Sequence, residues 1–218
     1  MKKNFWLINA SDNTDTAQIY LYGYIGSDDQ VCASEFVQEL MELQKSYKTI
    51  EVHINSQGGS VYEGLALITA LKKCSAELVG YVDGIAASMA AVIALSLPKL
   101  YMSKYARLMT HRVQAGCYGN ADEIRTQADQ VQSVENDLVD ILAKKTGLKP
   151  EQARAKFITN TDKWMTAQEA MQEGLINGVF DGMEVAVPEG VKDVKNVYNI
   201  FSEVINSTKT DKTTIILL

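Results

Sequence analysis

The sequence is poor in cysteine, proline and histidine for a chain of 218 residues. Its three cysteines, Cys32, Cys74 and Cys117, are widely spaced and form no C-x-x-C pair. An odd number of isolated thiols argues against the disulfide framework of a small secreted domain and favours reduced cysteines in the cytoplasm. Only three prolines and a hydrophobic content of 46% exclude collagen-like and disordered chains. The composition is that of a globular protein.

Long apolar runs and dense basic runs are also missing. The N-terminal run at residues 5–8 is too short for a signal-peptide core. The apolar stretch at residues 86–97 ends before Pro98, well short of the ~20 residues that a spanning helix needs. A net charge of −6 and a pI near 5.0 argue against a nucleic-acid surface. We therefore expect a cytoplasmic protein with no membrane partner and no nucleic-acid partner.

Metal and nucleotide signatures are absent as well. The two histidines, His53 and His111, are far apart and belong to no H-E-x-x-H motif. Neither G-x-x-x-x-G-K nor G-x-G-x-x-G occurs. We expect no metal and no cofactor.

Hydrophobic periodicity predicts strands that alternate with helices. β-branched and aromatic runs predict strands at residues 18–26, 49–55 and 78–82. Apolar residues at helical spacing predict helices at 33–46 and 61–73, and a third, apolar helix that ends before Pro98. This order is typical of an α/β domain with a largely parallel sheet.

The second half of the chain predicts one long helix over residues 120–145. Asn120 and Glu123 form a capping-box pattern at its start, and Gly147 can end it. At 1.5 Å per residue such a helix is ~38 Å long, so we expect it to project from the domain and to meet another subunit. Pro150 opens a further short helix, and residues 166–169 form a second capping box with Gly174 as the stop.

Ser88 is the best candidate nucleophile. It stands at the junction of a predicted strand and helix among small residues, as a tight turn that exposes a hydroxyl requires. The amide of Met89 would fall in the first helical turn, where unpaired N–H groups favour negative charge. The alternative is an ordinary serine N-cap, which is the commoner role.

Two further features could belong to the same site. His111 follows an apolar strand and precedes a Gly/Asn-rich stretch, whereas His53 lies inside a strand and reads as structural. The paired glycines Gly58 and Gly59 lie between a strand and a helix, where bare amides can donate to an oxyanion or a phosphate, or form an ordinary tight turn. Each feature by itself is weak.

Taken in order, four motifs resemble the Clp protease proteolytic subunit family, particularly its phage-type head maturation (prohead) protease branch. They are I-N-S-Q-G-G at 54–59, G-I-A-A-S-M-A at 84–90, M-T-H at 109–111 and T-D-K-W-M-T-A-Q-E-A at 161–170. The resemblance covers about residues 17–182. It implies the ClpP/crotonase-like fold of repeated β-β-α and βαβ units, with residues 120–146 as a handle helix.

The same resemblance implies the roles of individual residues. Ser88 matches the nucleophile, His111 the general base and Asp162 the residue that orients the base. Gly59 and Met89 match the donors of the oxyanion hole. The residues implied to bind substrate as an added strand are Gly58, Ala115, Gly116 and Cys117. Gln57 and the pair Arg112–Val113 stand where many members have proline.

The resemblance also implies a self-compartmentalised serine endopeptidase in stacked rings. Its substrates would be polypeptides or phage capsid precursors, and its partners an AAA+ unfoldase or capsid proteins. The implied organisation is an N-terminal segment (1–16), a peptidase domain (17–182) and a C-terminal tail (183–218), which could be flexible. Two alternatives share the fold: a crotonase-type acyl-CoA enzyme, and a catalytically silent homologue that only forms rings.

Overall fold

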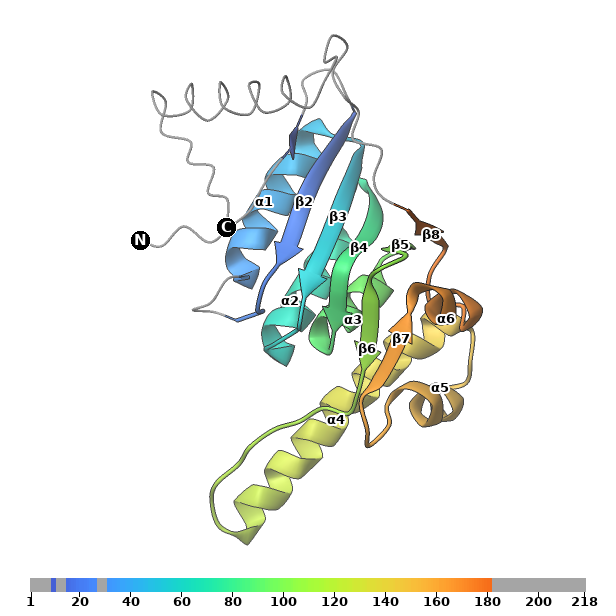
Figure 1. Ribbon diagram of the computed structural model, residues 1–218. Coiled ribbons are helices and arrows are strands. Elements are labelled where there is room, and N and C mark those ends of the chain that lie inside the picture. The colour runs from blue at the N-terminus through green and yellow to red at the C-terminus, as the bar shows by residue number, and fades with distance from the viewer. Residues whose placement is uncertain (1–8, 11–14, 27–30, 182–218) are drawn as a thin grey trace. The chain divides into compact units, whose positions relative to one another are not determined.

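The computed structural model describes residues 9–10, 15–26 and 31–181, in which strands and helices alternate (Figure 1). The strands are β1 (Asn9–Ala10), β2 (Thr16–Tyr22), β3 (Thr49–Ser56), β4 (Glu77–Ala87), β5 (Lys99–Ser103), β6 (Arg107–Thr110), β7 (Lys163–Thr166) and β8 (Gly178–Phe180). The helices are α1 (Ala33–Ser46), α2 (Val61–Lys73), α3 (Met89–Ser96), α4 (Ala121–Thr146), α5 (Pro150–Phe157) and α6 (Ala167–Gln172). The predicted α/β class is confirmed. The predicted tail at 183–218 and most of the N-terminal segment at 1–16 lie outside the described residues.

The sheet is mainly parallel, and β4 is its longest strand. β2, β3, β4, β5 and β8 pair in parallel in the order β2-β3-β4-β5-β8. The neighbour of β4 changes along its length: residues 79–82 pair with β5, and residues 85–87 pair with β6. β6 in turn pairs with β7 in the antiparallel sense. One long strand therefore connects the main sheet to the β6–β7 pair.

The core lies between one face of this sheet and the helices. Alternate residues of β2, namely Ala17, Ile19 and Leu21, are fully buried, as expected for a strand covered on one face. Helices α1, α2 and α3 lie on the same side of the sheet in Figure 1. Every residue from Met89 to Leu95 is buried, so α3 is enclosed on all sides. This burial fixes the start of α3 firmly in the domain.

Two predicted strand boundaries are wrong. The first strand ends at Tyr22 instead of residue 26, because Gly23 has a φ of 105° and breaks the extended backbone. The third strand was expected at residues 78–82, but β4 continues through Gly84 to Ala87. Its additional residues are held by pairing with β6, a long-range contact that local composition does not encode.

The long helix α4 begins and ends as predicted. The side chain of Asn120 accepts hydrogen bonds from the amides of Asp122 and Glu123, and the Glu123 carboxylate accepts one from the amide of Asn120. Gly147 ends the helix with a φ of 71°. Residues 121–130 are all exposed, and this part of α4 extends beyond the sheet in Figure 1. None of the helices in the described residues is both long and apolar enough to cross a membrane.

Candidate active site

The candidate site lies where three parallel strands end. Ser56 at the end of β3 is paired with Ala86 of β4, and Ala87 is paired with Met109 of β6. Parallel strands present their carboxyl ends at one edge of a sheet, and ligand sites commonly form there. The segments just beyond these ends carry the predicted residues Gly58 and Gly59, Ser88, and His111. The topology therefore brings together residues that are far apart in the sequence.

Ser88 occupies a sharp turn between β4 and α3. Its φ of 55° makes it the one non-glycine residue with a positive φ in the part of the chain that the structure describes. Such strain costs about 1–3 kcal/mol and is typical of a turn that presents a nucleophile. Ser88 precedes α3 but makes no side-chain capping bond, so the N-cap alternative does not describe it. Its amide donates to the carbonyl of Met109 at 3.0 Å, which ties the turn to β6.

The Ser88 hydroxyl lies against the imidazole of His111. The distance between Ser88 Oγ and His111 Nε2 is 2.7 Å, which is a hydrogen bond. His111 directly follows β6, and its side chain is 19% exposed, so the ring is largely enclosed but reachable from solvent. A serine hydroxyl on a strained turn beside a neutral imidazole is the arrangement of an activated nucleophile and its base.

Asp162 lies on the other side of the histidine ring but does not reach it. Its Oδ1 is 3.6 Å from His111 Nδ1, too long for a hydrogen bond. Within the described residues His111 Nδ1 is buried without a hydrogen-bond partner. The Asp162 side chain is 51% exposed. The structure thus brings all three residues into line, with the serine–histidine contact formed and the histidine–aspartate contact open.

The glycine turn packs directly against Ser88. Gly58 and Gly59 have φ values of 95° and 148°. A Cβ on Gly58 would lie 2.8 Å from Ser88 Cβ and 2.9 Å from the amide nitrogen of Met89. The Gly58 amide is engaged by Ser56 Oγ at 3.1 Å, and Met89 opens α3, where an amide has no intrahelical acceptor. The turn and the start of α3 therefore meet beside the hydroxyl.

The residues implied to bind substrate lie in an exposed stretch between β6 and α4. Ala115, Gly116 and Cys117 have no regular secondary structure. A groove of about 510 Å³ lies between this stretch and α4, lined in part by Ala115 and Cys117. A second hollow of about 420 Å³ lies at residues 95–98 and the end of α4. Neither hollow is lined by Ser88 or His111.

His53 lies inside β3, as predicted, and takes no part in this arrangement. Its side chain is fully buried, with Nδ1 at 2.9 Å from Asp83 Oδ2. Its ring stacks between Tyr20 and Tyr81 on the neighbouring strands, with centroids 4.7 and 5.1 Å away. Burial lowers the pKa of His53, but the carboxylates of Asp83 and Glu51 raise it by more, so it lies above its ordinary value of 6.5.

Two charged residues beside the site, Glu135 and Arg112, were not predicted to have a role. Glu135 is buried in α4, four residues after Val131 and three before Leu138. An acidic residue on the apolar stripe of a helix is a signal that it has a buried partner. That partner is Arg112, which stands in the sequence only as a departure from the family pattern.

Comparisons with known proteins agree with this geometry. The family described as Clp protease matches residues 4–183. A protein of Bacteroides fragilis named "ATP-dependent Clp protease proteolytic subunit" is 35% identical over 135 residues, which are 61% of this chain and 64% of that protein. Proteins named as proteolytic subunit 1 from Corynebacterium jeikeium and Prochlorococcus marinus are each 33% identical, over 72% and 75% of this chain and 85% and 83% of their own lengths. The match thus spans less than two thirds of the Bacteroides relative.

A parallel-sheet fold with a serine on a strained turn beside a histidine defines the class of serine-type hydrolases. The chain belongs to the Clp protease family. The predicted family, and with it the serine-type peptidase class, are confirmed. The narrower resemblance to the phage head maturation branch stays a prediction, because the relatives above carry the names of Clp subunits.

Proposed function

We propose that this chain is a serine endopeptidase whose peptidase domain spans residues 17–182. Ser88 is the nucleophile, His111 the general base and Asp162 the residue that orients the base. The observation that carries the proposal is the 2.7 Å contact between Ser88 Oγ and His111 Nε2 at a turn where the serine has a φ of 55°. Membership of the Clp protease family supports the same activity.

Each residue of the proposed triad has one task. His111 Nε2 takes the Ser88 proton as Oγ attacks the peptide carbonyl carbon, and then gives that proton to the leaving amine. Water, activated by the same base, hydrolyses the acyl-enzyme. Asp162 holds the histidine tautomer and stabilises the imidazolium. In this proposal the 3.6 Å gap between Asp162 and His111 closes when substrate binds, as catalytic contacts of unliganded enzymes commonly do.

The amides of Gly59 and Met89 are proposed to form the oxyanion hole. The tetrahedral intermediate carries its negative charge on the former carbonyl oxygen, next to the attacked carbon. The close packing of the glycine turn on Ser88 and Met89 supports donors at that place. Each such donor contributes about 3 kcal/mol to stabilising the transition state in comparable sites.

Substrate is proposed to bind as an added strand along Ala115, Gly116 and Cys117, with Gly58 at the opposite side of the bound peptide. An extended peptide that pairs with exposed backbone gains main-chain hydrogen bonds that do not depend on its sequence. The exposure of residues 114–118 and their lack of a strand partner support this role.

The assembly is proposed to be a homo-oligomer of stacked rings. The exposed outer part of α4, residues 121–130, would provide the contact between rings. An AAA+ unfoldase is a proposed partner because the relatives are named as ATP-dependent. Capsid precursors are the proposed substrates if the chain belongs to the phage branch.

Degradation of a fluorescently labelled, permanently unfolded polypeptide tests the proposal. The wild type should release small fluorescent peptides, and Ser88→Ala should release none. Turnover of an acyl-CoA thioester without peptide release would replace the proposal with the crotonase-type alternative. No turnover of either substrate by the assembled wild type would favour the silent, ring-forming homologue.

A further inference from the structure

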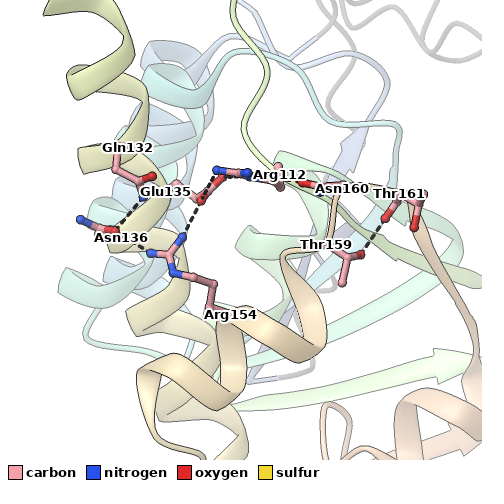
Figure 2. Close-up of polar contacts among 8 residues, drawn as sticks. All are labelled: Arg112, Gln132, Glu135, Asn136, Arg154, Thr159, Asn160 and Thr161. Carbon is pink, nitrogen blue, oxygen red and sulfur yellow. Dashed lines mark hydrogen bonds and ion pairs between the residues drawn. The ribbon is translucent and has the colours of Figure 1, made fainter. Parts of the chain in front are cut away.

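Glu135 is a buried charged residue that the catalytic steps above do not use (Figure 2). It projects from α4 and is 1% exposed. Its carboxylate accepts two hydrogen bonds from Arg112, at 3.1 Å from Nε and 3.3 Å from Nη2. It accepts a third from Arg154 of α5, at 2.5 Å from Nη1. One carboxylate thus holds two guanidinium groups, and we refer to these three residues as the Glu135 cluster.

The cluster keeps Glu135 ionised in spite of its burial. Burial alone raises the pKa of the Glu135 carboxyl, but the hydrogen bonds and charge of Arg112 and the charge of Arg154 lower it by more. The net pKa therefore lies below the ordinary value of 4.5. A fixed negative charge with bidentate geometry holds an arginine in one orientation.

Arg112 connects this charge to both chain segments that carry the proposed base and its orienting residue. It directly follows His111 in the sequence. Its Nη1 donates to Asn160 Oδ1 at 3.4 Å, two residues before Asp162 (Figure 2). The turn at this point is closed by a hydrogen bond from Thr159 Oγ1 to the carbonyl of Thr161 at 2.7 Å.

Asp162 needs such support because its own surroundings do not fix it. Its side chain is half exposed and lies 3.6 Å from a buried His111 Nδ1 that has no hydrogen-bond partner in the described residues. Movement of the 159–162 turn by a fraction of an ångström decides whether the two groups bond. The contact between Arg112 and Asn160 is the side-chain link from the Glu135 cluster to that turn.

We propose that Glu135 is a positioning residue for the proposed triad: by holding Arg112 against Asn160, it sets the position of Asp162 relative to His111. This inference rests on the proposed function for its catalytic meaning. Arg154 has a different task, because it joins Glu135 to α5 and donates to Asn136 of α4 at 2.5 Å without contacting the 159–162 turn in the described structure. The two arginines thus separate positioning from the anchoring of α5.

This separation makes the variants informative. Glu135→Gln removes the charge at nearly constant volume, and Arg112→Gln breaks the link to Asn160 while it leaves Glu135 paired with Arg154. Arg154→Gln breaks the anchor of α5 and leaves Arg112 on Glu135. Asp140→Asn, at an exposed acidic position of α4, is the matched control for the loss of one negative charge.

The first readout is the rate at which a fluorophosphonate labels the assembled protein. Glu135→Gln and Arg112→Gln should each slow labelling about tenfold or more, because small misplacements of catalytic groups are costly. Arg154→Gln should slow it much less, and Asp140→Asn should leave it unchanged. In an Asp162→Asn background, Glu135→Gln should have no further effect, since both changes act on the same contact.

The second readout does not need activity. The chain has two histidines, so the imidazole resonances of His111 and His53 can be separated in an NMR spectrum of histidine-labelled protein. Glu135→Gln and Arg112→Gln should shift the His111 resonance and leave that of His53, while Asp140→Asn should move neither. This comparison tests the inference even if wild type fails to react with the fluorophosphonate, the result that would overturn the proposed function.

Two results would overturn the inference. One is an unchanged His111 resonance in both Glu135→Gln and Arg112→Gln proteins that remain folded by circular dichroism. The other is a labelling defect of Glu135→Gln that persists undiminished in the Asp162→Asn background, because Glu135 would then act only through the general stability of the fold.

Discussion

At the scale of single residues, the candidate site depends on backbone positions that tolerate very little side chain. Ser88 has a φ of 55°, and Gly58 lies so close that a Cβ there would be 2.6 Å from the carbonyl oxygen of Ala87. The turn and the hydroxyl are therefore fitted to each other. A change on one side has to displace the other.

Gly58→Ala should disconnect the site. The new Cβ would collide with the Ser88 turn at a φ of 95°, so we expect a loss of about 1–3 kcal/mol in the free energy of unfolding and at least a tenfold loss of peptidase activity. Gly174→Ala is the matched control, because Gly174 has a φ of 72° but no atom within 4 Å of its added Cβ. Urea denaturation and peptide hydrolysis measure both effects. Equal activities in the two variants would contradict the account.

His53 should make stability depend on pH. Its pKa is raised above 6.5 because the attraction of Asp83 and Glu51 outweighs burial. A raised folded-state pKa contributes stability that is fully present below the unfolded value and is lost as pH rises through the folded value. The stability advantage of the wild type over His53→Phe should therefore shrink as pH rises from about 6 toward 9. Thermal unfolding across that range measures it, and a constant difference would contradict the assignment.

At the scale of elements, the outer part of α4 has no core contacts within one described chain. Residues 121–130 are exposed, and Ile124 is 43% exposed on a helix that is otherwise polar there. The helix persists because its first turn is capped from both sides by Asn120 and Glu123. An apolar residue on an exposed, well-formed helix favours a contact with another subunit.

Ile124→Glu should weaken the proposed contact between rings. A carboxylate placed in an apolar interface loses its hydration without a partner, so the assembly should fall to about half its mass. Gln130→Glu, on the same exposed part of α4, adds the same charge away from Ile124 and should leave the mass unchanged. Sedimentation velocity measures the masses. An unchanged mass for Ile124→Glu would exclude this part of α4 as the contact.

The elements also show what the sequence can predict. The caps of α4 and α6 and the start of α5 at Pro150 are confirmed because they are local, each set by residues within four positions. The far end of β4 was missed because Asp83–Gly84 resembles a turn locally, and its strand conformation comes from pairing with β6. The partners of Glu135 were missed for the same reason, since both arginines are far away in the chain.

At the scale of the whole molecule, the candidate site is a consequence of topology. Parallel strands β3, β4 and β6 end at one edge, so a glycine turn, a serine and a histidine from three separate segments meet there. The residue types and their order were predictable, and the 2.7 Å serine–histidine contact agrees with them. Asp162 could be named only through the family resemblance, because nothing local distinguishes it among 27 acidic residues.

The central claim is that Ser88 is a nucleophile activated by His111. Intact mass spectrometry after reaction with a fluorophosphonate tests it most directly. The account predicts one adduct per chain, located on the peptide that contains Ser88, and its loss in both Ser88→Ala and His111→Ala. No adduct on the folded wild type, or an adduct that survives Ser88→Ala, would contradict it.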